Sequence, residues 1–283
     1  MITEGSAAPT LCVSVVVHNS SLERLEATLR CLAAALRQAV DGGALGAVEV
    51  VLYDNASQAA YQESLGKRVA ALADQFPPPL HLMQMRSEEN LGYGRGVNEA
   101  AKARDAQFLL VLNPDIDLAP DAIVAALACL RRRGDAVCVA PRCTGRTGEP
   151  EYLCKRYPAV LDLLLRGLAL APLERLFHKR LARYEYRELS GATASEVMLV
   201  SGACMFMRRA AFDAVGGFDA GFFMYFEDFD LSMRLRERGA LLFEPTMSVV
   251  HYGGYASRKG RQHVRWFLGS ALRFYRRHGW RLL

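Results

Sequence analysis

The sequence of 283 residues lacks several features that mark familiar protein classes. No stretch approaches ~20 apolar residues without a charge, so we expect no transmembrane helix. Residues 1–5 are not a basic region leading into an apolar core, so no secretory signal is predicted and a cytoplasmic location is expected. The seven cysteines include no Cys-x-x-Cys pair, which favours small core residues over disulfides or zinc ligands.

Acidic side chains are missing from residues 256–283, although the net charge of the whole chain is only +5. Aromatic residues alternate there with cations, notably Arg265, Trp266, Arg273, Phe274, Arg276 and Arg277. Such a segment suits an anionic membrane, a diphosphate or a nucleic acid, and the alternative is a packed helix with solvated arginines. We expect a basic aromatic helix in peripheral contact with the inner membrane face, and no nucleic-acid partner.

Strand-like and helix-like segments alternate along the first half of the chain. Predicted strands cover residues 13–17, 48–53, 80–85, 108–112 and 136–140. Predicted helices cover residues 22–40, 59–73, 94–103 and 120–132. This alternation is typical of an α/β fold with a mostly parallel sheet and helices on both faces.

The pattern loosens after Pro141, where residues 142–195 are predicted to form an insertion with an amphipathic helix. The sheet is expected to resume at residues 197–207, and a helix is expected after Glu227 and Asp228. No linker divides the chain. We therefore expect one domain over residues 1–255, followed by the basic helix over 256–283.

Two aspartates follow the buried strand 108–112, in the run Asn113-Pro114-Asp115-Ile116-Asp117. Pro114 cannot donate a ladder hydrogen bond, so the strand is predicted to end there. Asp115 and Asp117 would then lie on a loop at the carboxyl end of the strand, where open α/β sheets bind ligands. Two carboxylates one residue apart can hold Mg²⁺ or Mn²⁺ against a diphosphate. In the alternative, Asp117 caps the helix that begins near Pro120.

Polar residues also end the first two predicted strands. His18 and Asn19 follow the first, and Asp54 follows the second, on the same rim as Asp115 if the sheet is parallel. Asp54 can accept a hydrogen bond from the N3–H of uracil or thymine. The alternative for Asp54 is an Asx-turn.

A glycine-rich stretch at residues 90–98 is a weaker signal. It contains Asn90, Gly92 and Arg95, and it opens a helix whose free N–H groups can face a nucleotide or phosphate. It matches neither the Walker A loop nor the dinucleotide fingerprint.

An acidic cluster flanked by aromatic residues lies at Glu227, Asp228 and Asp230. A carboxylate in such a partly dry setting can act as a general base. The alternative is the start of a helix, where the helix dipole stabilises acidic side chains. Asp230 is expected to pair with Arg234 at i+4. His251 ends a further strand, where a lone histidine is more often structural than a ligand.

Taken together and in this order, the motifs resemble family 2 of the inverting glycosyltransferases, and in particular rhamnosyltransferase-like members. The resemblance runs from about residue 13 to residue 251. It implies the GT-A fold, a single Rossmann-like nucleotide-binding domain, with a donor half over about 11–141 and an acceptor half over about 142–255. The chain has no predicted transmembrane helices of the kind that processive synthases carry, so it is expected to add one sugar or a few.

The resemblance also implies roles for individual residues. Asp115 and Asp117 match the motif that contacts ribose and metal, with Asp117 as the more direct metal ligand. Asp228 matches the catalytic base, and His251 matches a histidine that completes the metal site in some members. The residues expected to line the nucleotide-sugar site are His18, Asn19, Asp54, Asn90, Gly92, Arg95, Asp115 and Glu227.

The function implied is the metal-dependent transfer of a sugar with inversion of its anomeric configuration, with Mg²⁺ or Mn²⁺ as cofactor. The expected donor is dTDP-L-rhamnose, or alternatively a UDP-sugar. The expected acceptor is a glycan, or a sugar linked to polyprenyl diphosphate, in cell-surface polysaccharide synthesis. A sugar-1-phosphate nucleotidyltransferase is disfavoured because no glycine-rich, arginine-containing loop lies near the first strand. A non-catalytic nucleotide-sugar-binding module is disfavoured because Asp115, Asp117 and Asp228 are all present.

Overall fold

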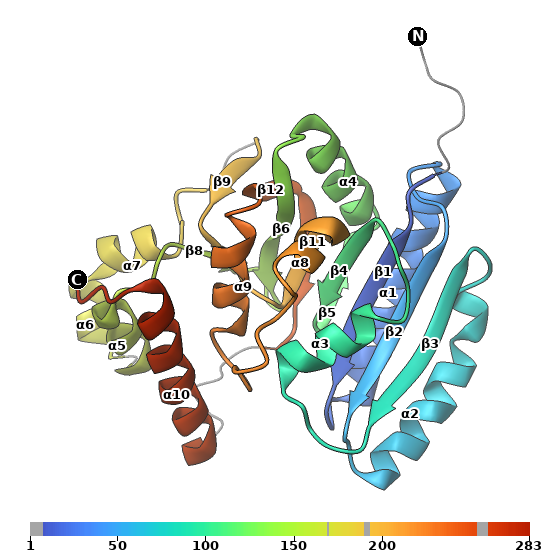
Figure 1. Ribbon diagram of the computed structural model, residues 1–283, viewed down its shortest axis with the longest axis horizontal. Helices are drawn as coiled ribbons and strands as arrows, with labels where there is room; N and C mark the ends of the chain where they lie inside the picture. The colour runs from blue at the N-terminus through green and yellow to red at the C-terminus, as the bar shows by residue number, and fades with distance from the viewer. Residues whose placement is uncertain (1–7, 169, 190–192, 254–259) are drawn as a thin grey trace.

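A mixed central sheet organises the chain, and helices cover both of its faces (Figure 1). The computed structural model describes residues 8–168, 170–189, 193–253 and 260–283. Within these ranges the main sheet has ten strands, in the order β3-β2-β1-β4-β11-β6-β12-β5, with β7 and β9 paired at its margins. The fold is the α/β arrangement that the sequence predicts.

The amino-terminal half of the sheet is parallel, as predicted. Its strands are β1 (Leu11–Val17), β2 (Val48–Asn55), β3 (Leu80–Ser87) and β4 (Phe108–Leu112). Val17 lies opposite Asp54 in the register, so the ends of β1 and β2 meet. Since parallel strands put their carboxyl ends on one edge, the polar residues after β1, β2 and β4 share one rim.

Helices pack on the two faces because each carries an apolar stripe. One face is covered by α1 (Leu22–Asp41), α2 (Ala59–Ala71) and α4 (Ala122–Arg132). The other is covered by α3 (Tyr93–Ala101), α8 (Arg209–Ala214) and α9 (Glu227–Leu235). The side chain of Ser21 caps α1 by accepting the N–H of Arg24, as the sequence suggests.

The second half departs from the predicted strands in three places. The aspartate run is not all loop, because Ile116–Leu118 forms the edge strand β5, which pairs with β12 (Ala240–His251). Strand β6 is longer than predicted and spans Ala136–Gly145. The predicted strand 197–207 is broken, and its pieces are β9 (Ser195–Val197), β10 (Leu199–Val200) and the antiparallel β11 (Cys204–Arg208).

The predicted insertion is a mostly helical lobe beside the sheet (Figure 1). It contains β7 (Pro150–Glu151), β8 (Cys154–Lys155), α5 (Val160–Leu168), α6 (Ala171–Leu176) and α7 (His178–Tyr184). The carboxyl-terminal helix α10 (Gly260–His278) packs against α9 and this lobe. In the described part of the chain, no helix is long and apolar enough to cross a membrane.

Most of the cysteines, and two aromatic residues of the predicted tail, are buried or half-buried. All seven cysteines are free and six are buried, which confirms their interpretation as core residues. Phe274 of α10 is fully buried, and Trp266 is half-buried with its ring 4.7 Å from that of Phe223. These two aromatics therefore belong to the protein interior and not to the exposed face of the tail. Residues 254–259, which include Arg258 and Lys259 of the predicted basic segment, lie outside the described residues.

Candidate active site

The ends of β1 and β2 are joined by a network of side-chain hydrogen bonds. Asn19 donates its backbone N–H to Oγ of Ser57 at 2.9 Å and accepts the N–H of Gln58 at 3.0 Å. The ring of His18 lies with Nδ1 3.0 Å from the carbonyl oxygen of Asn55. Asn19 has a φ of 49°, a left-handed value that is uncommon outside glycine and often marks functional sites. Both predicted residues therefore lie on the shared rim.

Asp54 is fully buried at the end of β2. Its Oδ1 accepts the N–H of Ser57 at 3.0 Å, which is the local turn that the sequence offered as an alternative. Its Oδ2 is buried and has no hydrogen-bond partner among the described residues. Because a buried acceptor without a partner is costly, this oxygen suits a ligand donor such as the N–H of a base.

The glycine-rich stretch contacts protein backbone at close range. Gly92 has a φ of +83°, and a Cβ there would overlap the carbonyl oxygen of Phe223, which accepts the N–H of Tyr93 at 3.1 Å. Asn90 and Asn55 hold this turn, with Asn55 Nδ2 donating to Oδ1 of Asn90 at 3.0 Å. The glycine at 92 is thus required by the loop before α9, a contact that the sequence does not reveal.

Arg95 lies apart from the other predicted residues. It is exposed on α3 and lines a surface pocket with Lys102 and Arg209, neither of which belongs to the predicted site. Tyr93, two residues earlier, faces the acidic cluster instead. Its hydroxyl donates to the carbonyl oxygen of Gly202 at 2.7 Å. The structure thus brings Tyr93, which was not predicted, into the site.

Asp115 lies where β4, β12 and the turn before β11 meet. The N–H of Asn113 bonds to the carbonyl oxygen of Ala203 at 2.8 Å, and the carbonyl oxygen of Asp115 accepts the N–H of Tyr252 at 2.9 Å. Oδ1 of Asp115 is buried without a hydrogen-bond partner among the described residues. A Cβ at Gly253 would overlap the carboxylate. The space beside this carboxylate is therefore too narrow for any residue other than glycine at position 253.

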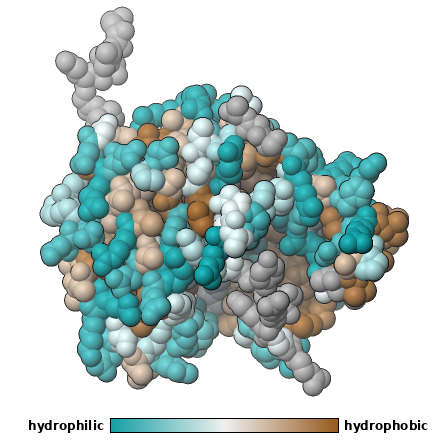
Figure 2. Space-filling view, turned by 180° about the vertical axis from the view of Figure 1, so that it is seen from behind, coloured by the Kyte–Doolittle hydropathy of each residue, from teal (hydrophilic) through white to brown (hydrophobic). Residues whose placement is uncertain are grey.

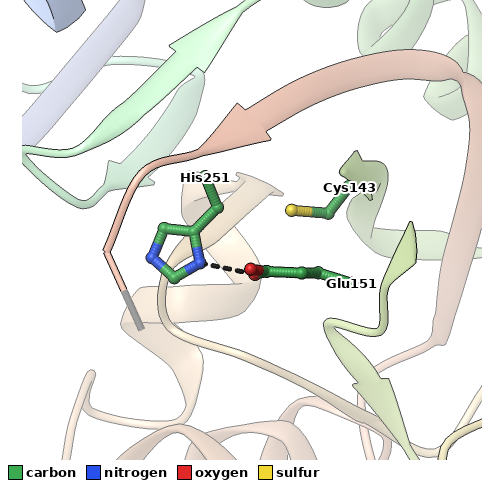
Figure 3. A group of neighbouring side chains, drawn as sticks. All are labelled: Cys143, Glu151 and His251. Atoms are coloured by element: carbon green, nitrogen blue, oxygen red, sulfur yellow. Dashed lines mark hydrogen bonds and ion pairs between the residues drawn. The ribbon is translucent and has the colours of Figure 1, made fainter. Parts of the chain in front are cut away.

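His251 is held between two carboxylates (Figure 3). Its Nδ1 lies 2.7 Å from Oε2 of Glu151 on β7, and its Nε2 lies 3.6 Å from Oδ1 of Asp115. Burial lowers the pKa of His251, but the nearby carboxylates of Asp115 and Glu151, the second of them hydrogen-bonded to the ring, outweigh it and raise the pKa overall. A histidine with one ring nitrogen fixed by a carboxylate is a common arrangement around bound metals.

The thiol of Cys143 lies in the same group, and the ligand atoms of Cys143, Glu151 and His251 are within 4.8 Å of one another. Burial raises the pKa of Cys143 to about 12, so the thiol is neutral near pH 7. A thiolate is the form that binds metal. The oxygen and nitrogen atoms of Asp115 and His251 therefore fit a hard divalent cation better than a site built on Cys143.

Asp117 does not join this group. It lies on β5 opposite Val250, and its carboxylate forms an ion pair with Arg24 and accepts the hydroxyl of Thr28 at 3.2 Å, both on α1. It does not cap α4 either, since Asp121 occupies the N-cap position. The loop position expected for Asp117 is therefore wrong, because the chain after Pro114 resumes as a strand that turns this side chain toward α1.

The acidic cluster opens α9 in a strained turn. Tyr225 and Phe226 have φ values of 69° and 61°, which bulky residues rarely adopt. Asp228 is half-buried, and its Oδ2 accepts the N–H of Gly202 at 2.9 Å. A Cβ at Gly202 would lie 3.3 Å from that of Asp228, so glycine allows this close approach.

Burial sets the protonation of the two neighbouring acids. It raises the pKa of Asp228, although the N–H of Gly202 opposes the rise. Burial and the charge of Asp228 raise the pKa of Glu227 to about 8. Two adjacent carboxyl groups resist being charged together, so near pH 7 Glu227 is mostly protonated.

The remaining acid of the cluster has a structural role. Asp230 is fully buried, and its Oδ2 accepts from Nε of Arg234 at 2.8 Å, which confirms the expected i+4 pair. His278 of α10 contacts Oδ1 of the same carboxylate at 2.9 Å. Asp230 thus links α9 to the carboxyl-terminal helix.

Comparison with known proteins gives a family match and curated relatives. The model of the family described as glycosyltransferase like family 2 matches residues 9–269. An N-acetylglucosaminyl-diphospho-decaprenol L-rhamnosyltransferase of Mycobacterium tuberculosis is 32% identical over 181 residues, which cover 59% of this chain and 58% of that protein. The rhamnosyltransferase WbbL of Escherichia coli is 26% identical over 183 residues, covering 63% and 65%. These matches span less than two thirds of either relative.

Solved structures share the fold at low sequence identity. A mannosyltransferase from Pyrobaculum calidifontis in complex with GDP-Man and Mn²⁺ has a TM-score of 0.59 at 16% identity, covering 95% of this chain and 65% of that one. GalNAc-T7 with UDP, GalNAc and Mn²⁺ has a TM-score of 0.64 at 17% identity, covering 96% and 48%. The central sheet is therefore that of the GT-A glycosyltransferases, and with the family match over residues 9–269 the chain belongs to glycosyltransferase-like family 2.

Proposed function

We propose that the protein is a metal-dependent inverting glycosyltransferase that moves L-rhamnose from dTDP-L-rhamnose to a glycan acceptor linked to polyprenyl diphosphate. The observation that carries this proposal is a candidate metal pair, Asp115 and His251, close to a half-buried candidate base, Asp228: the base bonds to Gly202, and the next residue, Ala203, bonds to Asn113. The names of the curated relatives support rhamnose and a lipid-linked acceptor. A UDP-sugar is the alternative donor.

Asp115 and His251 would hold Mg²⁺ or Mn²⁺, and Glu151 would orient His251. Three observations fit such an ion: the partnerless Oδ1 of Asp115, the restricted space beside Gly253, and the hydrogen bond from His251 to Glu151. A bound divalent ion would supply charge stabilisation to the departing diphosphate. Asp117 is assigned a structural role, in place of the metal role that the sequence suggested.

The donor nucleotide would lie across the ends of β1 and β2. The free Oδ2 of Asp54 would accept the N3–H of thymine or uracil. His18 and Asn19 would border the nucleotide from β1. The backbone around Asn90 and Gly92 would border it from the other side. Residues 11–141 would thus form the donor half and residues 142–255 the acceptor half.

Asp228 would take the proton from the acceptor hydroxyl as that oxygen attacks the anomeric carbon. The C–O bond to the diphosphate breaks as the new C–O bond forms on the opposite face, so one displacement inverts the configuration. Glu227 stays neutral beside it and avoids a second buried charge. Gly202 holds Asp228 by donating its N–H to the carboxylate, and Tyr93 in turn donates its hydroxyl to the carbonyl oxygen of Gly202.

We also propose that this reaction takes place on the cytoplasmic face of the membrane, where lipid-linked sugars of cell-surface polysaccharides are assembled. The test of the donor is a panel of nucleotide sugars added with Mn²⁺, measured by thermal stabilisation of the protein. The proposal expects dTDP-L-rhamnose to raise Tm most, and EDTA to cancel the rise. Equal shifts with and without EDTA would contradict the metal role.

A further inference from the structure

We propose that the outward face of α10 is a docking surface for an anionic lipid bilayer. This inference rests on the proposed function, because a lipid-linked acceptor requires the active site to reach a membrane. Of the residues that the sequence suggested for the membrane contact, the inference keeps only Arg265 and Arg276.

An apolar stripe runs along the exposed side of α10. Val264, Leu268 and Leu272 follow one another at i, i+4 and i+8, so they lie on one face of the helix. Their exposed fractions are 57%, 61% and 39%. A surface helix normally turns such a stripe toward the core. Here the core is contacted by a different face, which carries Phe274 and Ser270.

Cations border the stripe. Arg276 lies four residues after Leu272 and Arg265 lies seven before it, so helical spacing sets both beside the stripe. Both side chains are exposed. Residues 245–283 contain no acidic side chain. An apolar stripe beside arginines on one helix is the pattern of an amphipathic helix lying in the interface of an anionic bilayer.

The neighbouring lobe also carries exposed apolar side chains. Of the large apolar side chains that are exposed in the described residues, all but Tyr252 lie on α5, α6, α10 or the residues next to them; those outside α10 are Leu164, Leu170, Leu176, Trp280, Leu282 and Leu283. Viewed from behind, this side of the molecule shows hydrophobic surface among hydrophilic residues (Figure 2). A bilayer fits this surface better than a second copy of the chain, because a symmetric dimer would bring the arginines of two copies together.

Other tail cations are already engaged with protein. Arg273 and Arg277 both pair with Asp219, at 3.2 Å and 2.6 Å. Trp266 packs against Phe223. These residues therefore belong to the inward side of α10 and are not assigned to the lipid contact.

The inward side of α10 holds the loop that precedes the candidate base. Ser270 donates its hydroxyl to the carbonyl oxygen of Met224 at 2.8 Å, and the hydroxyl of Tyr225 lies 2.8 Å from Nδ1 of His263. This loop leads directly into Asp228 at the start of α9. A bilayer on the outer face of α10 would therefore lie one helix away from the loop before Asp228.

The test is co-sedimentation with phosphatidylcholine vesicles, with and without phosphatidylglycerol, at low and high salt. We expect the wild-type chain to bind only the vesicles with phosphatidylglycerol, and salt to release it. The variant V264Q/L268Q/L272Q changes exposed side chains only and should bind about tenfold or more weakly. The variant R265Q/R276Q should lose a similar amount. The control R131Q/R238Q, with the same charge change at exposed sites on other elements, should bind as wild type does.

Vesicle binding does not require a bound nucleotide, so binding of dTDP with Mn²⁺ is measured separately on the same variants to distinguish the two proposals. Wild-type donor binding in the stripe variant together with lost vesicle binding supports a lipid surface. Vesicle binding that survives in V264Q/L268Q/L272Q would overturn it. Failure of the wild-type chain to bind anionic vesicles would also overturn it. So would a wild-type dimer that becomes monomeric in V264Q/L268Q/L272Q while neither protein binds vesicles.

Discussion

Nε2 of His251 lies 3.6 Å from Oδ1 of Asp115, across the pairing of β12 with β5. The other ring nitrogen is hydrogen-bonded to Glu151, so the imidazole cannot turn without losing that contact. The pair combines one oxygen and one nitrogen ligand. Asp228 lies nearby, because it bonds to Gly202 and the next residue, Ala203, accepts the N–H of Asn113. Of the three residues proposed for the metal from the sequence, this relationship favours Asp115 and His251 over Asp117.

The two aspartates of the run are predicted to behave differently when changed to asparagine. Asp115→Asn should weaken Mn²⁺-dependent binding of dTDP by at least about 100-fold, because a proposed ligand is lost. Asp117→Asn should leave that binding nearly unchanged. It should instead lower the free energy of unfolding by about 1–3 kcal/mol, since Arg24 loses its partner in a half-buried site. Calorimetry and urea unfolding measure the two effects, and the reverse pattern would restore Asp117 as the ligand.

Glu151 is predicted to position His251. Glu151→Gln keeps the shape of the side chain but removes its charge, and should weaken Mn²⁺ binding about 10- to 100-fold. The matched control is Cys143→Ala in the same cluster, which should keep wild-type affinity for Mn²⁺. If the cysteine variant lost affinity and the glutamine variant did not, the cluster would bind metal through sulfur.

The sequence predicted the parallel half of the sheet well, because its strands are short apolar runs and α1 shows a clear leucine spacing. It failed where tertiary contacts decide the structure. The edge strand at Ile116–Leu118 forms because β12 pairs with it, and no local sequence pattern predicts this pairing. The break at Gly202 likewise depends on contacts with Tyr93 and Asp228.

The positions of Asp54 and Asp115 at strand ends were predictable from the sequence, while their roles in the candidate site stay predictions. The candidate site was not predictable where a residue arrives from a distant short strand. Glu151 lies on β7, which has two residues, and it meets His251 one hundred positions later in the chain. The sequence also did not indicate that Arg95 is exposed on α3, beside Lys102 and Arg209 and away from the other predicted residues.

Glu227 is predicted to make stability depend on pH. Its pKa rises from 4.5 toward about 8 in the folded protein, so the folded state binds the proton more tightly than the unfolded state. Stability is therefore greatest below about pH 4.5 for this group and is lost as pH rises through about 8. Glu227→Gln cannot ionise and should flatten this decline in a series of Tm values from pH 5 to about pH 9. A variant with the same decline as wild type would show that another group causes it.

Gly92 is predicted to be essential for folding of the loop before α9. Gly92→Ala would clash with the carbonyl oxygen of Phe223 and would need a left-handed φ, so it should lower the free energy of unfolding by more than about 1 kcal/mol. Gly66→Ala on α2 is the control. Nothing lies within 4 Å of its added Cβ, so helix propensity should stabilise the protein by about 0.5–1 kcal/mol. Chemical denaturation compares the two, and equal effects would contradict the proposed contact.

The most direct measurement of the account is sugar transfer by wild type and by Asp228→Asn, with dTDP-L-rhamnose, Mn²⁺ and a polyprenyl-diphosphate-linked sugar. Asparagine keeps the shape of Asp228 and cannot take the acceptor proton. We predict that kcat falls by about 10²- to 10⁴-fold while donor affinity changes little. Product from wild type should carry the inverted anomeric configuration. An Asp228→Asn variant with wild-type kcat, or a product with retained configuration, would contradict the proposed mechanism.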